Sequence, residues 1–357
     1  MNARAIVTTL VTALLVCTGV APAQPKLIVG ILHVGSITDA GYNQAHADGI
    51  QAMKRNLPEV EVIEVENVPE GADAERVMES LIKRGARLII PASFGYLEPA
   101  LRVAQRYPEV KFAHPGGYKR VPNLTTYWAS TPEGFYLLGM AAGKVTRTNK
   151  IGYVVALPIS FFLANINAFE LGARSVNPKA ETRLVFTGTF LDPAKEATAA
   201  TALLDQGADV LGVIVDSPIT VVQTAEKRGA YSVGYHYLGA QKFAPNGWIS
   251  GIAFTWGNLY TRFARQVLDG SFKSENILGS LGDDLLAIAP FGPAVPADAA
   301  SLVNAKRQEF IGGRAHPFQG PLKDNTGVER VKAGEVFPLT DLGKMNWLVE
   351  GVVGQPR

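Results

Sequence analysis

Cysteine is almost absent from this chain of 357 residues, because Cys17 is its single thiol. One cysteine excludes an internal disulfide and a metal site built from several thiolates. An excess of charge of one sign is also lacking, since 34 Lys and Arg balance 32 Asp and Glu. A near-neutral chain without a basic cluster is not expected to bind nucleic acid, which needs a basic face for its phosphates.

Catalytic signatures are missing as well. The five histidines show no paired spacing for a metal ion; they are His33, His46, His114, His236 and His316. Neither a Gly-x-Ser-x-Gly elbow nor a phosphate-cradling glycine loop occurs. The sequence therefore predicts no catalytic residues, no metal and no cofactor, and an enzyme is the disfavoured class.

Long hydrophobic runs are absent except at the start, where residues 5–16 are almost uniformly apolar. The run follows a short basic region and precedes a small-x-small pattern at residues 21–23, so we predict a cleaved signal peptide at 1–23. A membrane anchor is the alternative, but the run falls short of the ~20 residues that span a bilayer. Val16 before Cys17 is not the small residue of a lipoprotein signal, which favours a freely soluble periplasmic product.

Short β-branched runs alternate with helix-length amphipathic stretches along the rest of the chain, a pattern typical of an α/β fold with parallel sheets covered by helices on both faces. The first expected strands are Leu27–Val34, Val60–Val65, Leu88–Pro91, Val110–His114 and Leu124–Trp128, with helices at Gly41–Asn56, Ala72–Arg84 and Leu97–Tyr107. A second series of strands follows at Lys150–Ala156, Arg183–Thr187, Val210–Asp216, Tyr231–His236 and Trp248–Phe254.

The two series are related by a shift of 122 positions, which carries Gly30 onto Gly152. The same shift carries Gly85–Ala86 onto Gly207–Ala208, Val62–Ile63 onto Leu184–Val185 and the helix start at Ala72 onto Ala194. Chance agreement between common βα patterns is the alternative. A shared register over several elements favours duplication, and therefore two similar lobes.

We expect the first Rossmann-like lobe to comprise residues 24–130 plus 255–290, and the second 131–254 plus 291–315. Residues 316–357 then form a C-terminal extension that packs on one lobe. In open parallel sheets a ligand lies beyond the carboxyl ends of the strands. Two facing sheets thus predict an interlobe cleft lined by the strand exits.

The exit of the first strand carries Asp39, Tyr42 and Asn43. An aromatic face beside an amide that both donates and accepts suits the edge of a heterocyclic base. Asp39 has two open interpretations, because its carboxylate can accept N–H groups from a heterocycle or cap the first turn of the following helix.

Aromatic or acidic residues also follow other strands of both series: Phe94, Phe161, Phe162 and Asp216. A single Phe is as often a core residue, but a group of them at strand ends favours a cleft that clamps a flat ligand between rings. A sugar site also uses aromatic platforms, although it usually needs more carboxylates and Arg than these exits offer.

Seven motifs together resemble the basic membrane protein (Bmp) family, the purine-binding type I periplasmic receptors of ABC transporters. They span the chain after the signal peptide and lie at Asp39–Asn43, Glu70–Asp73, Ser93–Pro99, Tyr136–Gly139, Lys150–Tyr153, Gly207–Val210 and His316–Pro321. The resemblance implies two Rossmann-like lobes joined by three crossovers, with a purine held between aromatic rings.

Carried over by position, the resemblance gives Asp39 and Asn43 the role of base-edge contacts and makes Tyr42 and Phe161 the opposing rings. It makes Glu98 and Asp216 further polar contacts.

Relatives that bind nucleosides hold the ribose with an Asp after the fourth strand of the second lobe and a Lys after the fifth. This chain has His236 near the first position, and Thr255 and Trp256 near the second. The resemblance therefore implies a free nucleobase such as adenine rather than a nucleoside, with Trp256 beside it. Receptors for another solute, such as a sugar, and a secreted purine nucleoside hydrolase remain the alternatives.

The expected partner is an ABC transporter permease, reached by a monomer whose lobes close around the ligand. Closure is expected to hinge on crossovers near Ser130, Thr255 and Pro290.

Overall fold

The computed structural model describes residues 27–356, so the predicted signal peptide and Cys17 lie outside the described residues. A six-stranded parallel sheet has the order β11-β5-β4-β3-β1-β2. Its strands are β1 (Leu27–His33), β2 (Val60–Val65), β3 (Ala86–Ala92), β4 (Lys111–Pro115), β5 (Leu124–Ala129) and β11 (Asn276–Gly279). The helices of this first lobe are α1 (Tyr42–Asn56), α2 (Ala72–Lys83), α3 (Leu97–Arg106) and α8 (Gly257–Asp269).

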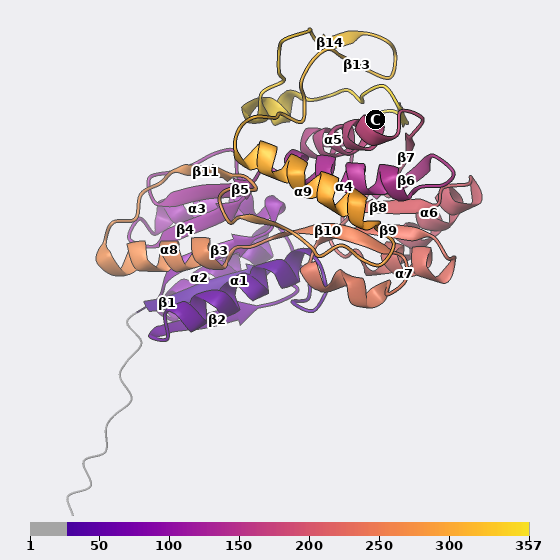
Figure 1. Ribbon diagram of the computed structural model, residues 1–357. Coiled ribbons are helices and arrows are strands. Elements are labelled where there is room, and N and C mark those ends of the chain that lie inside the picture. Colours follow the sequence, from indigo (N-terminus) through magenta and orange to yellow (C-terminus); the bar gives the residue numbers. More distant parts are fainter. Residues whose placement is uncertain (1–26, 357) are drawn as a thin grey trace, which may run out of the picture.

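A second sheet has the order β12-β10-β9-β8-β6-β7-β15. Its strands are β6 (Lys150–Val155), β7 (Glu181–Phe186), β8 (Val210–Ile214), β9 (Tyr231–His236), β10 (Trp248–Phe254), β12 (Leu286–Ile288) and β15 (Val352–Val353). This second lobe carries α4 (Pro132–Val145), α5 (Ser160–Val176), α6 (Pro193–Asp205), α7 (Ile219–Lys227) and α9 (Ala297–Ile311). Figure 1 shows the two lobes side by side.

The strands form because their apolar residues are buried on both faces of each sheet, as parallel sheets require. All seven residues of β10 are buried. In the first lobe, α1 and α8 pack against one another, while α2 and α3 pack together in a separate apolar cluster. The predicted α/β class with parallel sheets and covering helices is confirmed; β11 and β12 were not predicted, because runs of four and three residues carry too little pattern.

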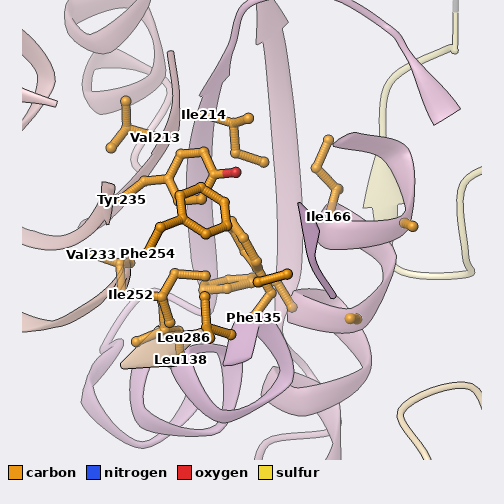
Figure 2. Packing of buried hydrophobic residues seen from close by; sticks show 14 of the residues in the cluster. Phe135, Leu138, Ile166, Val213, Ile214, Val233, Tyr235, Ile252, Phe254 and Leu286 are labelled. Atoms are coloured by element: carbon orange, nitrogen blue, oxygen red, sulfur yellow. The ribbon is translucent and has the colours of Figure 1, made fainter. Parts of the chain in front are cut away.

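The second-lobe core shows how the helices cover their sheet. Figure 2 shows Phe135 and Leu138 of α4 packed with Ile252 of β10, and Leu286 of β12 beside them. Burial of such side chains stabilises each by about 1.5 to 3 kcal/mol. The second lobe is therefore held by a continuous core between α4, α5 and the sheet.

The internal repeat has a packing basis. A Cβ on Gly30 would lie 2.9 Å from the side chains of Leu81 and Ile89. A Cβ on Gly152 would lie 2.8 Å from Leu203 and 2.7 Å from Leu211. Since the shift of 122 carries each residue of the first set onto the second, the same close helix-on-strand contact occurs once in each lobe.

The chain crosses between the lobes three times, after β5, after β10 and between β11 and β12. The crossovers lie together, because Ser130 donates its N–H to Gly279 O at 2.7 Å and Thr255 donates its N–H to Leu285 O at 3.1 Å. The third crossover ends before Leu286, not near Pro290: β12 pairs antiparallel with β10, so residues 286–288 belong to the second sheet. Residues 255–290 are therefore divided between the two sheets.

The C-terminal extension follows α9 and lies over α5 (Figure 1). It contains β13 (Leu322–Lys323), β14 (Glu329–Val331) and the short 3-10 helix η3 (Leu339–Lys344), and it ends in β15, which pairs with β7. Among residues 27–356, no helix has both the length and the apolar character to cross a bilayer.

Candidate functional site

A cavity of about 890 Å³ lies between the lobes, at the carboxyl ends of the strands. It is lined by exits of β1, β3 and β4 from the first sheet and of β6, β8 and β9 from the second. This is the position at which parallel α/β sheets place their ligands. Five of the predicted site residues line it: Tyr42, Asn43, Phe94, Phe161 and Asp216.

Aromatic rings from both lobes face the cavity. The first lobe supplies Phe94, Tyr118 and Trp128, and the second supplies Phe161, Phe162 and Phe190. Phe94 is 49% exposed and Phe161 41% exposed, so a face of each ring is accessible. Large exposed rings on opposite walls of one cavity suit a flat apolar guest.

Two carboxyl groups join these rings at the cavity wall, Glu70 and Asp216. Ser93 donates its hydroxyl to Glu70 Oε1 at 2.8 Å, which orients that carboxylate. Burial, followed by the nearby carboxylates of Asp39 and Glu196, raises the pKa of Asp216 to about 8. A protonated Asp216 both donates and accepts a hydrogen bond, which is the pattern that one edge of a nucleobase or an amide presents.

The lobes touch directly at one end of the cavity. Tyr42 donates its N–H to Asp216 O at 2.8 Å, and Ser217 donates its hydroxyl to Asp39 O at 2.7 Å. A Cβ on Gly41 would lie 1.8 Å from Asp216 O. The approach of the two lobes therefore depends on the missing side chain at residue 41.

Tyr42 and Asn43 line the cavity, but both side chains are buried, with 8% and 1% of their surface exposed. The Tyr42 ring meets His46 and His236 edge-on, with ring centroids 4.6 Å and 5.4 Å away. The Asn43 amide accepts the Gly35 N–H at 3.1 Å and donates to Asp39 Oδ2 at 2.8 Å. One amide hydrogen and one oxygen lone pair of Asn43 remain for a ligand.

Three predicted site residues, Asp39, Glu98 and Trp256, are not among the residues that line this cavity. The Asp39 carboxylate accepts the backbone N–H groups of Gly41, Asn43 and Gln44, so it acts as the helix cap that the alternative interpretation gave it.

Glu98 is exposed on α3 and pairs with Lys119 at the surface. Trp256 is 1% exposed and stacks on Phe254, with ring centroids 4.8 Å apart, because the start of α8 turns it into the core.

His236 lies at the exit of β9 and lines the cavity. Its backbone is left-handed, with φ of 70°, a conformation that is uncommon outside Gly but that His, Asn and Asp adopt more often than other residues do. Burial lowers the pKa of His236 to about 3, so the imidazole is neutral, and its Nδ1 has no hydrogen-bond partner. A neutral imidazole, with one buried nitrogen that has no hydrogen-bond partner, thus lies in the cavity wall.

Several lining residues were not assigned a role from sequence. Glu70 belongs to a motif quoted above, and Trp128 ends a predicted strand, so both carried a signal at a strand exit. Leu339 and Thr340 of the C-terminal extension also line the cavity. Nothing in the βα pattern connects them to the cleft. Within residues 27–356 no group of three or more His, Cys, Asp or Glu side chains is arranged to hold a metal ion.

Comparisons with known proteins agree with this geometry. A family model described as Bmp, "ABC transporter substrate-binding protein PnrA-like", matches residues 26–295. The chain is 37% identical over 335 residues to a purine-binding protein of Brucella abortus (strain 2308), covering 94% of this chain and 95% of the relative. It is 31% identical over 324 residues to a Haloferax volcanii protein that carries the name of an ABC transporter glucose-binding protein, covering 91% and 80%.

Among solved structures, an ABC transporter solute-binding protein from Conexibacter woesei DSM 14684 superposes with a TM-score of 0.69 at 25% identity, covering 81% of this chain and 98% of the other. The resemblance read from the motifs is therefore confirmed. The chain belongs to the Bmp family of PnrA-like ABC transporter substrate-binding proteins.

Proposed function

We propose that this chain is the periplasmic substrate-binding component of an ABC uptake transporter, and that it binds a purine nucleobase in the interlobe cavity and delivers it to a permease. The observation that carries the proposal is the set of exposed rings on both walls, Phe94 and Phe161 among them, around the carboxyl groups of Glu70 and Asp216. Stacking on such rings contributes about 1 to 3 kcal/mol per base. The purine-binding relative supports the choice of ligand.

A nucleobase fits better than a nucleoside because the expected ribose partners are replaced. His236 is neutral where the resemblance implies an Asp, and a neutral imidazole binds ribose hydroxyls less strongly than a carboxylate does. Thr255 donates its hydroxyl to Asp284 O at 2.5 Å and lies outside the cavity lining, as Trp256 does. Neither position supplies the cation that would complete a ribose site.

A sugar receptor is the second candidate, and the glucose-binding name of the Haloferax relative favours it. Glu70 and Asp216 are acceptors for hydroxyl groups, and aromatic platforms suit the apolar face of a sugar ring. The raised pKa of Asp216 favours the base instead, because a protonated carboxyl matches an edge with one donor and one acceptor.

Calorimetry and thermal shift with adenine, hypoxanthine, guanine, adenosine and glucose test the proposal. A ligand at about 100 times its dissociation constant stabilises the folded state by about 2.7 kcal/mol. We expect the bases to give the largest shift and adenosine a smaller one. A melting temperature that glucose raises and every purine leaves unchanged contradicts the proposal.

We propose binding without turnover, acting as a monomer. Incubation with adenosine is expected to release no free adenine, since the proposal places no acid–base pair beside a glycosidic bond. Release of adenine in proportion to protein concentration would identify the hydrolase instead. Sedimentation is expected to give the mass of a single chain.

Closure of the lobes about the three crossovers accompanies binding in this proposal. Small-angle scattering is expected to give a smaller radius of gyration with ligand, and an unchanged radius would speak against closure.

A further inference from the structure

The C-terminal extension lies outside the part of the chain that the family model matches, which ends at residue 295. It nevertheless places Leu339 and Thr340 in the lining of the ligand cavity. In the second sheet, the last strand whose exit lines the cavity is β9, which ends at His236. Leu339 and Thr340 lie more than a hundred residues further along the chain. The extension therefore reaches the site by its own packing.

That packing fixes the extension to the second lobe. β15 adds a strand to the edge of the second sheet, with Val352 opposite Thr182 and Val353 opposite Arg183. Asn167 of α5 is fully buried, donates to Trp347 O at 2.9 Å and accepts the Val349 N–H at 2.8 Å. Backbone groups paired in a buried setting hold a segment firmly, because separation would leave them unsatisfied.

Three aromatic rings pack in sequence within the extension and fix the segment that precedes Leu339. Phe318 is fully buried and meets Phe337, and Phe337 meets Trp347, with centroids 6.2 Å apart in each pair. Residues 339–344 then pack as η3 on α5, whose first turn bears Phe161 and Phe162. Leu339 is partly buried against the second-lobe core, so its side chain has a defined place at the cavity edge.

We infer that the C-terminal extension is a third wall of the ligand cavity, with Leu339 and Thr340 as specificity-determining residues for groups that project from a bound base. The inference rests on the proposed function for the identity of the ligand. Since the extension is attached to the second lobe, this wall moves with Phe161 and limits how large a substituent the cavity accepts beside it.

Thiol protection tests the position of the wall. Thr340→Cys is made in a chain that carries Cys17→Ser, so that the new thiol stands alone. Saturating adenine is expected to slow its alkylation by at least several-fold. The control is Val336→Cys, which is 43% exposed in the same extension and outside the cavity lining, and its rate is expected to stay constant.

The choice of probe separates the two proposals. If calorimetry shows that no purine binds, the proposed function fails, and the alkylation is repeated with glucose should glucose bind. Protection of Thr340→Cys by either bound probe supports the wall. Equal alkylation with and without a probe that calorimetry shows to be bound overturns it.

Leu339→Ala tests specificity. Shortening this side chain is expected to change the ratio of the adenine and adenosine dissociation constants roughly 10-fold in favour of adenosine, in the range for a few methylene groups in a pocket. Leu302→Ala is the matched control, because Leu302 is 43% exposed on α9 and outside the cavity lining. If both variants keep the wild-type ratio while the wild type binds adenine, Leu339 does not determine specificity.

Discussion

The two lobes agree in their packing and differ at their strand exits. Gly30 and Gly152 occupy equivalent close contacts with Leu81 and Leu203. At the exits, the same shift of 122 residues pairs unlike side chains: Asp39 with Phe161, Glu70 with Asp192, and Phe94 with Asp216. Dense packing constrains the two glycines, because a close-packed interior does not accommodate even one extra methylene group. The strand exits face open space, so their side chains are free to differ.

The exchange at the exits makes the cleft asymmetric. Asp39 caps α1, while its counterpart Phe161 lines the cavity. Asp192 caps α6 by accepting the Lys195 N–H at 3.1 Å, while its counterpart Glu70 lines the cavity. In these two pairs one lobe uses the position for helix capping and the other for the cavity wall, whereas Phe94 and Asp216 both line the cavity. A duplicated scaffold thus gives a cavity with rings and a carboxyl on each wall, but at positions that the repeat does not make equivalent.

The substitution with the largest expected effect on binding disrupts the contact between the lobes at Gly41. Gly41→Ala places a methyl group 1.8 Å from the position of Asp216 O. We expect the lobes to stay apart and the affinity for adenine to fall roughly 100-fold or more, since the closed state becomes rare. Calorimetry measures the affinity.

Ser217→Ala is the control, because it removes one interlobe hydrogen bond without a clash. Ser217→Ala is expected to weaken adenine binding by about 1 kcal/mol, the typical net contribution of one hydrogen bond. Wild-type affinity in Gly41→Ala would show that this contact plays no part in binding.

The next effect compares the rings of the two lobes. Phe94→Ala and Phe161→Ala are each expected to weaken adenine binding by about 1 to 3 kcal/mol if the base lies between them. Titration calorimetry at one salt concentration gives both values. A loss in one variant alone would place the base against a single lobe and remove the sandwich.

His236 sharpens the comparison further, because its left-handed backbone also suits Asp and Asn. His236→Asp is expected to improve adenosine relative to adenine about 10-fold, since a carboxylate forms a charge-assisted bond of about 1.5 to 3 kcal/mol with a hydroxyl. His236→Asn, without the charge, is expected to leave the ratio near that of the wild type. Equal ratios in all three proteins would place the ribose elsewhere.

The last comparison is a pH dependence of stability, rather than of binding, at Asp216. Folded Asp216 holds its proton up to a pH of about 8, whereas an unfolded Asp loses it near a pKa of about 3.9. The folded state binds more protons between these values, so this group makes the free energy of unfolding fall as the pH rises, by at most about 1.4 kcal/mol per pH unit.

Asp216→Asn removes the titrating group and keeps the shape of the side chain. Its melting temperature without ligand is expected to fall less between pH 5 and pH 8 than that of the wild type. Identical slopes for the two proteins would show that the Asp216 pKa is not raised.

Sequence reasoning located the cleft but did not reveal which of the predicted residues line it. Strand exits follow from periodicity, so Phe94, Phe161 and Asp216 were found at the cavity. The direction of a side chain at an exit depends on competing hydrogen bonds, which the pattern does not encode. Asp39 turns to the free N–H groups of α1, and Trp256 turns into the core.

The sequence by itself determined the fold class, the internal duplication and the edge at which a ligand lies, because these depend on apolar periodicity and on local turns. Only the tertiary structure decided which side chains share the cavity. Glu70, His236 and the pair Leu339 and Thr340 come from three separate segments, and the pair reaches the cavity only because β15 and η3 pack on the second lobe. Contacts between segments that are far apart in the chain produce no periodic pattern of apolar residues, so the sequence alone does not reveal them.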